Sequence, residues 1–280
     1  MAHRLAPPVD WIAAYLKEDR AEADITSQAI FAADHPGVAT LHVRSRCFVA
    51  GVQVAVSVFE RLGASCDVHV EDGTWADAGT AILTVRGPTR AILAGERLAL
   101  NILGRMSGIA TATRGPVEAL GAACSGALVA GTRKTTPGFR VFEKQAIVIA
   151  GGVPHRMDLE EEAMIKDNHR EAAGSVTAAV RAVKEAFPDK VLTTEVESLD
   201  EAMEAAAAGT DWILIDNQTP EVGQMWADAV WAGHPQVKVE ASGGIGPDDV
   251  VAYGWADRIS MGWLTHQAVS ADVGLDWGGE

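Results

Sequence analysis

The chain has 280 residues, a formal net charge of −15, 48% hydrophobic residues and 22% charged residues, so it has room for one large α/β domain or a barrel-sized domain with a smaller partner. The acidity argues against nucleic acid and anionic membranes as general partners. No stretch approaches the roughly 20 apolar residues of a membrane span, the first residues lack a secretory h-region, and the three cysteines form no CxxC pair, so we expect a cytoplasmic protein without disulfides or zinc.

The first hundred residues show the patterns of a small α+β domain. Helical spacing of apolar residues predicts helices at 10–18, 52–63 and 89–104, with another beginning near Gly108. Alternating apolar and polar residues predict half-buried antiparallel strands at 38–45, 66–72 and 80–87. Residues 24–27 are predicted to form a turn. We therefore place a small α+β domain at residues 1–105.

From about residue 126 the patterns of strands and helices alternate. Strands are predicted at 127–131, 162–167, 191–196, 212–216, 237–242 and 258–262. Helices between them are predicted at 175–187, 198–209, 220–233 and 247–256. This spacing is typical of the βα units of a parallel barrel. A doubly wound sheet is the competing topology, but no GxGxxG follows any of the strands. We expect a parallel α/β barrel at residues 106–280.

Polar residues and glycines follow the predicted barrel strands. They are Thr132-Arg133-Lys134, Lys166-Asp167, Glu195, Asp216-Asn217, Ser242-Gly243-Gly244 and Gly262. In a parallel barrel such strand ends converge on one face, where active sites lie. Each one alone is as easily an ordinary polar residue that ends a strand. Together they sort into cations, carboxylates and glycines, which predicts an anion site at the barrel mouth.

The carboxylates and glycines of this set suggest a phosphate ligand with a metal ion. The segment at 241–249, read ASGGIGPDD, and Gly262 allow a ligand to approach the backbone, and a following helix N-terminus favours an anion. Glu195 and Asp216 are the natural pair to hold Mg²⁺, which prefers oxygen ligands. An ion pair with a neighbouring lysine is the alternative for these carboxylates.

The cations suggest a second anionic ligand. Arg133, Arg156 and Lys166 offer planar forks and a point charge to carboxylates or a diphosphate. His155 beside them is open to three interpretations: a neutral donor, a cation or a packed core histidine. No arrangement for covalent nucleophilic catalysis or glycoside hydrolysis is evident.

Eight segments strongly resemble the quinolinate phosphoribosyltransferase family, in the same order over nearly the whole chain. They are GERLALNILGRMSGIAT (95–111), GTRKTTPGFRVFEK (131–144), GGVPHRMDL (151–159), MIKDNH (164–169), TEVESLDEA (194–202), ILIDNQTPE (213–221), VEASGGI (239–245) and ISMGWLTHQA (259–268). The resemblance implies a small N-terminal α+β sandwich domain followed by an incomplete parallel α/β barrel of the TIM type. It implies a dimer in which one subunit's N-terminal domain covers the partner's barrel mouth.

The resemblance also implies the reaction: quinolinate and phosphoribosyl pyrophosphate (PRPP) give nicotinate mononucleotide, pyrophosphate and CO₂, with Mg²⁺, in NAD biosynthesis. Two alternatives are a molybdate-transport-associated paralogue of the same fold and a non-catalytic anion-binding barrel. The intact segment Lys166-Asp167-Asn168-His169 argues against the first. The retention of Glu195 and Asp216 argues against the second, since a mere phosphate binder would not need them.

Residue roles are implied by the same resemblance. The carboxylates of quinolinate would be bound by Arg133, His155, Arg156 and Lys166, with Arg97 donated by the partner subunit. Lys134 and Lys166 would face the phosphoribosyl donor, and Glu195 and Asp216 would serve its Mg-diphosphate and ribose hydroxyls. Backbone at Ser242, Gly243, Gly244 and Gly262 would bind the 5′-phosphate. Glu195 is chosen over Glu197 because Leu199 then aligns with the family.

Overall fold

The structure is a computed structural model that describes residues 10–278. The chain divides into two compact units, and each is made of more than one segment. The first unit comprises the residues up to 114 together with 136–150 and those from 268 onward. The second unit comprises residues 115–135 and 151–267.

The first unit contains a four-stranded antiparallel sheet with the order β12-β1-β5-β3. Its strands are β1 (Pro36–Val43), β3 (Ser65–Val68), β5 (Ala81–Pro88) and β12 (Val273–Trp277). Two short strands, β2 (Cys47–Phe48) and β4 (Trp75–Ala76), pair separately. The three strands predicted in this region are therefore present. The buried side chain of Leu41 lies opposite Leu83 on one side and Leu275 on the other, which places the core at the centre of the sheet.

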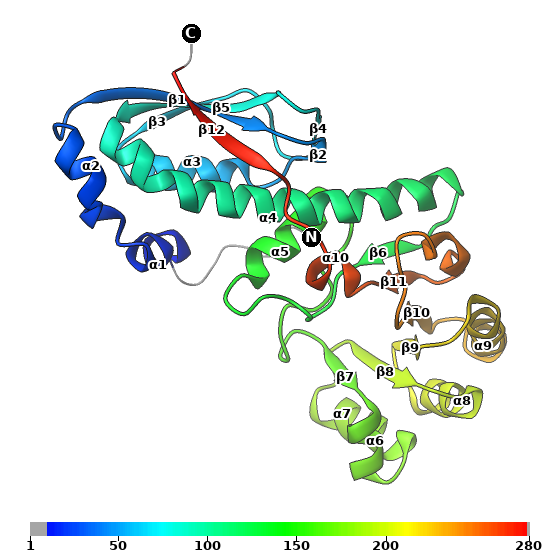
Figure 1. The fold of residues 1–280 in the computed structure, drawn as a ribbon. Coiled ribbons are helices and arrows are strands. Elements are labelled where there is room, and N and C mark those ends of the chain that lie inside the picture. Colours follow the sequence, from blue (N-terminus) through cyan, green and yellow to red (C-terminus); the bar gives the residue numbers. More distant parts are fainter. Residues whose placement is uncertain (1–9, 279–280) are drawn as a thin grey trace. The chain divides into compact units, whose positions relative to one another are not determined.

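Strand β12 comes from the far end of the described chain. Its residues pair with β1, so that Val43 faces Val273 and Ala39 faces Trp277 (Figure 1). The predicted division at residue 105 places this segment with the barrel, whereas its hydrogen bonds join it to the first sheet.

The helices of the first unit are α1 (Trp11–Glu18), α2 (Ile25–Ile30), α3 (Val52–Arg61), α5 (Arg140–Ile149) and part of α4 (Thr89–Ala122), with a 3₁₀ turn at Ala21–Ala23. Helix α3 buries Val52, Ala55, Val58 and Phe59 against the sheet. The turn predicted at 24–27 is instead the start of α2. Asp24 is its N-cap and accepts hydrogen bonds from the Thr26 and Ser27 amides at 3.0 and 3.3 Å.

Helix α4 corrects a second prediction. It runs unbroken through Gly104 and Gly108, where the sequence suggested one helix ending and another beginning. These glycines are positions of close approach. A Cβ atom at Gly108 would lie 2.1 Å from the Val269 carbonyl oxygen, and the Ala271 amide donates to the Gly104 carbonyl at 2.9 Å. Glycine here lets the segment before β12 lie against the helix.

The second unit contains a six-stranded parallel sheet with the order β6-β11-β10-β9-β8-β7. Its strands are β6 (Leu128–Ala130), β7 (Ala163–Ile165), β8 (Leu192–Val196), β9 (Trp212–Asp216), β10 (Lys238–Ser242) and β11 (Arg258–Ser260). All six lie within the predicted ranges. Strands β6 and β7 stand at opposite ends of this order, so the barrel is incomplete and the predicted α/β fold class is confirmed.

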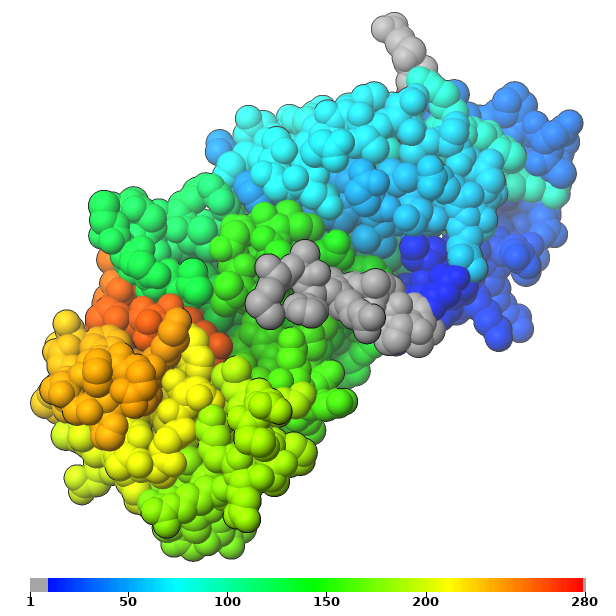
Figure 2. Space-filling view, turned by 180° about the vertical axis from the view of Figure 1, so that it is seen from behind, coloured from blue at the N-terminus to red at the C-terminus, as the bar shows by residue number. Residues whose placement is uncertain are grey.

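Helices α7 (Val176–Ala186), α8 (Leu199–Ala208) and α9 (Pro220–Gly233) cover the outside of this sheet. Side chains of these helices and of β8, β9 and β10 form one apolar core that includes Val180, Leu192, Ala205, Ile213 and Val230. On the surface, the segments of this unit follow one another in chain order, from yellow-green through yellow to orange (Figure 2).

The helix predicted at 247–256 is reduced to a single 3₁₀ turn, Val250–Tyr253. Its bonds join residues three apart, as in Gly254 N–H to Val251 O at 3.0 Å. Within this turn only Val250 is buried, so no apolar stripe supports a longer helix. Three helices were not predicted: α5, α6 (Asp167–Ala173) and α10 (Trp263–His266). In the described part of the chain, no helix is long and apolar enough to cross a membrane.

Candidate active site

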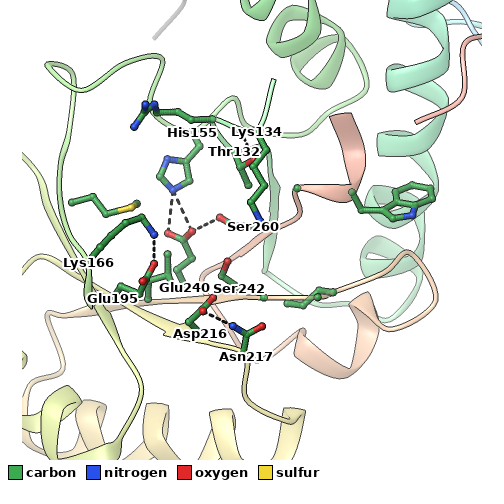
Figure 3. A pocket seen from close by; sticks show the side chains of 18 of the residues that line it. Thr132, Lys134, His155, Lys166, Glu195, Asp216, Asn217, Glu240, Ser242 and Ser260 are labelled. Atoms are coloured by element: carbon green, nitrogen blue, oxygen red, sulfur yellow. Dashed lines mark hydrogen bonds and ion pairs between the residues drawn. The ribbon is translucent and has the colours of Figure 1, made fainter. Parts of the chain in front are cut away.

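A cavity of about 570 Å³ opens at the carboxyl ends of the parallel strands in the second unit (Figure 3). The predicted site residues that line it are Arg133, Lys134, His155, Arg156, Lys166, Glu195, Asp216, Ser242, Gly243, Gly244 and Gly262. The remaining lining residues are Thr132, Met164, Leu214, Asn217, Glu240, Ile245, Ser260, Trp263, His266 and Gln267. The ends of the parallel strands therefore bring together residues that are far apart in the sequence.

Arg97 is the predicted site residue that does not line this cavity. It lies on α4 in the first unit, and its side chain is exposed. Its contribution to another subunit's site stays a prediction.

Lys166 and Glu195 form an ion pair inside the cavity (Figure 3). Lys166 follows β7, and Glu195 lies near the end of the neighbouring strand β8. The Glu195 side chain is 12% exposed, whereas that of Lys166 is 44% exposed. The ion pair that the sequence left open for this carboxylate is therefore present, and the lysine's other side is open to a ligand.

Asp216 ends β9, the next strand of the sheet, and also lines the cavity. Burial raises the pKa of its carboxyl, and the nearby negative charge of Glu195 raises it further. The amide of Asn217 donates to Asp216 Oδ2 at 2.5 Å. The charge of Asp216 is disfavoured by the neighbouring carboxylate of Glu195. A divalent cation at this pair would relieve that repulsion.

The carboxylate pair would hold such a cation together with a ligand rather than alone. Among residues 10–278, no group of three or more His, Cys, Asp and Glu side chains is arranged to hold a metal ion. Mg²⁺ commonly binds through one or two carboxylates plus substrate phosphates and water, which is the arrangement that two carboxylates can complete.

Arginines form a cationic wall on another side of the cavity. Arg156 is 8% exposed, and burial followed by the charge of Arg133 lowers the pKa of its guanidinium. Its Nη1 donates to the Glu162 carbonyl at 3.0 Å, which directs the group. The buried Nε of Arg133 has no hydrogen-bond partner among the described residues. Two neighbouring cations and an unused N–H fit an anionic ligand such as a carboxylate.

The glycine loop after β10 has a backbone that few other residues adopt. Gly243 and Gly244 have φ angles of 93° and 64°. A Cβ atom at Gly243 would lie 2.4 Å from Asn217 Oδ1. The loop after β10 therefore lies too close to the loop after β9 for any residue but glycine at this position. The helix N-terminus predicted to follow is absent, since only the 3₁₀ turn at 250–253 comes next. An anion at this loop would therefore be bound by the loop's own backbone and side chains.

The loops after β6 and β11 are packed together at the cavity edge. A Cβ atom at Gly262 would lie 3.0 Å from Lys134 Cδ. The Thr265 hydroxyl donates to the Lys134 carbonyl at 2.5 Å. These contacts hold Lys134 beside the loop that carries Gly262.

Four polar residues of the cavity were missed, namely Glu240, Ser260, His266 and Gln267. Glu240 and Ser260 lie within strands rather than after them. Glu240 stands in β10, two residues before Ser242 and on the same face, and Ser260 ends β11. The period-two alternation of a strand could have identified Glu240, since a charge at an inward position of a buried strand requires a partner. That partner set includes His155 and Arg258.

Family comparisons agree with this geometry. Residues 24–107 match the N-terminal domain of quinolinate phosphoribosyl transferase, and residues 109–276 match the C-terminal domain. This chain belongs to the quinolinate phosphoribosyltransferase family. The resemblance drawn from eight sequence segments is therefore confirmed.

Individual relatives are similar over almost their whole length. The nicotinate-nucleotide pyrophosphorylase [carboxylating] of Homo sapiens is 41% identical over 278 residues, which cover 97% of this chain and 93% of the relative. A probable enzyme of the same name from Methanothermobacter thermautotrophicus is 39% identical, with 96% and 98% covered. The solved structure of nicotinate-nucleotide pyrophosphorylase from Francisella tularensis has a TM-score of 0.89 and 30% identity, with 99% of this chain and 100% of that one covered.

Proposed function

We propose that this protein transfers the phosphoribosyl group of PRPP to quinolinate with loss of CO₂. The products are nicotinate mononucleotide and pyrophosphate, and the reaction belongs to NAD biosynthesis. The observation that carries the proposal is one cavity in which the arginine wall and the carboxylate pair occupy different strand ends, in a chain that matches both family domains. A substrate with two carboxylates and a donor with a diphosphate need these two kinds of surface.

Quinolinate would bind at the arginine wall. Arg133 and Arg156 would pair with its carboxylates, and Lys166 would reach it from the end of β7. The unused Nε of Arg133 is a donor that a carboxylate would satisfy. His155 lies beside Arg156 and would support this wall, since its ring nitrogens are bonded to the Arg156 amide and to Glu240.

The phosphoribosyl donor would bind across the carboxylates and glycine loops. Glu195 and Asp216 would hold Mg²⁺ with the diphosphate and the ribose hydroxyls, and Lys134 would face the same group. Backbone and side chain at Ser242, Gly243 and Gly244, with Gly262 opposite, would hold the 5′-phosphate. Positive φ angles at both loop glycines support close approach of a phosphate to the backbone.

In this arrangement the pyridine nitrogen attacks the anomeric carbon as the diphosphate leaves, through an oxocarbenium-like transition state. Lys134 and Lys166 offset the negative charge that develops on the leaving group. Mg²⁺, which Glu195 and Asp216 would hold, would supply further electrostatic stabilisation of that charge. The 2-carboxylate then leaves as CO₂, because the positively charged ring nitrogen stabilises the carbanion that remains. This carbanion takes up one proton to give nicotinate mononucleotide.

We further propose a cytoplasmic homodimer, or a larger assembly of such dimers, in which Arg97 reaches the partner's cavity. The exposed side chain of Arg97 on α4 and the unsatisfied donor at Arg133 support this arrangement, since both would pair with the substrate's carboxylates. Mixing an Arg97→Ala protein with an Arg133→Ala protein tests it. Two inactive variants should give partial activity when subunits exchange, because some mixed dimers contain one intact site.

The direct test is an assay of pyrophosphate and CO₂ release from quinolinate and PRPP with Mg²⁺. Both products should appear in equal amounts and only when quinolinate is present. Nicotinate, which has one carboxylate, and nicotinamide, which has none, serve as matched controls. Turnover of either control with quinolinate ignored would contradict the proposal.

A further inference from the structure

Glu240 is a completely buried carboxylate at the base of the cavity (Figure 3). It accepts hydrogen bonds from Arg258 Nε at 2.5 Å, from the Ser260 hydroxyl, and from His155 Nε2 at 3.2 and 3.3 Å to its two oxygens. Burial by itself raises the pKa of this carboxyl, but the bond from His155 and the charge of Arg258 outweigh it and lower the pKa to about 2. Glu240 is therefore an anion held entirely by protein groups.

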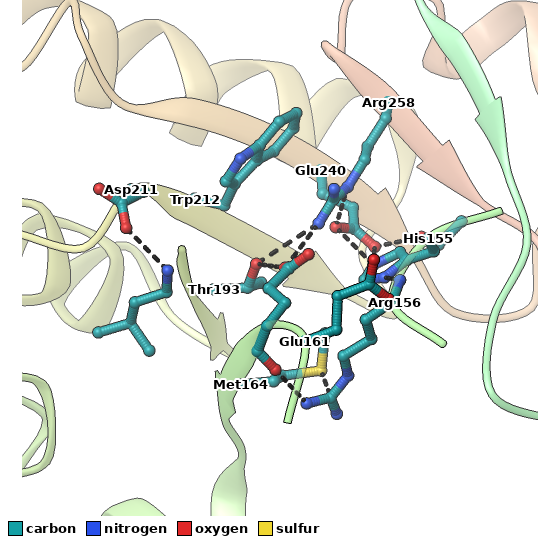
Figure 4. A network of polar contacts seen from close by, with 12 residues as sticks. His155, Arg156, Glu161, Met164, Thr193, Asp211, Trp212, Glu240 and Arg258 are labelled. Atoms are coloured by element: carbon teal, nitrogen blue, oxygen red, sulfur yellow. Dashed lines mark hydrogen bonds and ion pairs between the residues drawn. The ribbon is translucent and has the colours of Figure 1, made fainter. Parts of the chain in front are cut away.

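Arg258 is itself held on several sides (Figure 4). Its Nη2 lies 3.2 Å from Glu162 Oε1, and its guanidinium carbon lies 4.0 Å from the centre of the Trp212 ring. The hydroxyl of Thr193 donates to the same Glu162 oxygen at 2.5 Å. Because Arg258 has a fixed position, it fixes the orientation of the Glu240 carboxylate.

His155 is bonded through both ring nitrogens. The Arg156 amide donates to Nδ1 at 2.7 Å, and Nε2 faces the Glu240 carboxylate. An amide only donates, so Nδ1 must accept and the ring proton must lie on Nε2. The His155 side chain is 5% exposed. These two contacts describe a neutral imidazole with one defined tautomer.

The hydrogen bonds of the His155 ring stabilise an unusual backbone turn at this residue. Its φ angle is 55°, in the left-handed region that is unfavourable for a residue with a side chain. The turn it makes places Arg156 next, with Nη1 on the Glu162 carbonyl and Nη2 3.3 Å from Met164 Sδ. The ring bonds of His155 thus hold the turn from which Arg156 enters the cavity wall.

We propose that Glu240 is a positioning residue: it fixes His155 in the Nε2–H tautomer and, through the 155–156 turn, fixes the guanidinium of Arg156 for binding a pyridine dicarboxylate. The substrate class rests on the proposed function, whereas the tautomer does not. The path runs from Arg258 through Glu240 and His155 to Arg156, and each step is a hydrogen bond of the structure.

Replacing Glu240 by glutamine tests this path with almost no change in volume. Arg258 donates, so the glutamine oxygen must face it and the glutamine NH₂ must face His155. That NH₂ needs an acceptor at Nε2, which drives the ring proton to Nδ1. A proton on Nδ1 then opposes the Arg156 amide. In this variant the glutamine favours a proton on Nδ1, whereas the turn needs Nδ1 to accept a hydrogen bond from the Arg156 amide. In the wild type both contacts are satisfied by the same tautomer.

The experiment combines ring ¹⁵N spectra of histidine-labelled protein with calorimetry of quinolinate binding without PRPP. A His155→Gln variant assigns the His155 signals. Wild-type protein should show the proton on Nε2 of His155, and Glu240→Gln should show altered His155 signals with quinolinate binding weakened roughly tenfold or more. Asp211→Asn is the matched control, because it removes an ion pair to Lys184 at the opposite end of β9. It should leave both readouts unchanged.

A wild-type ring protonated on Nδ1 would overturn the proposal, and this measurement does not depend on whether any variant folds. Unchanged His155 signals together with unchanged quinolinate binding in folded Glu240→Gln would overturn it as well. Ser260→Ala, which removes one hydrogen bond to Glu240 and no charge, should weaken binding less than Glu240→Gln. Absence of quinolinate binding in wild-type protein would instead refute the proposed function, while the spectra would still decide the tautomer.

Discussion

Glu195 and Glu197 lie two residues apart in the chain, yet their carboxylates have different surroundings. Glu195 is inside the cavity, paired with Lys166. Glu197 follows the last residue of β8, is 63% exposed, and lies 3.4 Å from Arg170 of α6. The family resemblance favours Glu195 as the site carboxylate, and Glu195, rather than Glu197, lines the cavity.

This difference predicts opposite outcomes for two equivalent substitutions. Glu195→Gln should lower kcat/KM by roughly 100-fold or more, because it removes a charge from the proposed metal and diphosphate site. The kcat/KM of Glu197→Gln should stay within about a factor of five of the wild-type value, because an exposed ion pair contributes little to stability. Steady-state kinetics with both substrates measures the two effects. Equal losses in the two variants would contradict the placement.

Removal of a cation from the cavity wall should abolish turnover without unfolding the protein. Arg133→Ala or Lys166→Ala should cost about 2 to 5 kcal/mol of transition-state stabilisation, as for other desolvated charge pairs. Arg181→Ala, which removes an exposed arginine of α7, is the control and should be close to wild type. Circular dichroism checks the fold. Near-wild-type kcat/KM in Arg133→Ala would remove that residue from the site.

The acid side of the pH profile should report the raised pKa of Asp216. Burial and then the charge of Glu195 keep its carboxyl protonated at pH values where an exposed aspartate is ionised. A metal ion requires the ionised form, so Mg²⁺ affinity should begin to fall, as the pH is lowered, at a higher pH than for an ordinary aspartate.

Carboxyl ¹³C titration without Mg²⁺ measures this directly. Asp216 should titrate above the usual aspartate value of 3.8 in wild-type protein. Glu195→Gln should move the titration to lower pH, since it removes the second cause of the shift. An Asp216 that titrates at or below 3.8 in the wild type would be incompatible with the buried carboxylate pair.

The glycine loop should tolerate no side chain at Gly243. Gly243→Ala forces a Cβ atom against Asn217 at a φ angle of 93°, so we expect a loss of about 1 to 3 kcal/mol in unfolding free energy. The KM for PRPP should rise as well, because the loop is proposed to bind the 5′-phosphate. Gly126→Ala is the control, since its Cβ atom would meet nothing within 4 Å. Urea denaturation and kinetics of both variants separate the two effects.

The parallel strands could be predicted from the sequence because the apolar run that marks each strand involves only residues that are neighbours in the chain. The apolar run at 212–216 and its terminal Asp216 predicted both β9 and a cavity residue. The helix predicted at 247–256 failed because helical spacing there is not matched by a buried face, and Val250 alone is buried in the 3₁₀ turn. Whether a periodic stripe finds a partner surface is decided by packing, which the local sequence does not contain.

The residues that line the cavity at the strand ends were predicted from the sequence. The hydrogen bonds that join Arg258, Glu240 and His155 beneath them were not. Glu240 and Arg258 lie within β10 and at the start of β11, where charges are normally unfavourable. Their hydrogen bonds join positions 18 residues apart and continue to His155, 85 residues away in the chain. Pairings at such separations follow from the closure of strands into one sheet. The tautomer of His155, which the sequence left open, depends on this same closure.

Gly108 offers a test of why α4 does not break. The helical spacing of the sequence predicts helix boundaries at Gly104 and Gly108, whereas in the structure both glycines contact the segment before β12. Gly108→Ala should destabilise the protein by about 1 to 3 kcal/mol, because its Cβ atom would overlap the Val269 carbonyl oxygen at 2.1 Å. Gly121→Ala in the same helix meets nothing within 4 Å and should stabilise it by about 0.5 to 1 kcal/mol through helix propensity alone. Denaturant unfolding of the two variants gives the comparison. Stabilisation by Gly108→Ala would mean that the C-terminal segment does not lie against α4 at this residue, and β12 would then need another path to its pairing with β1.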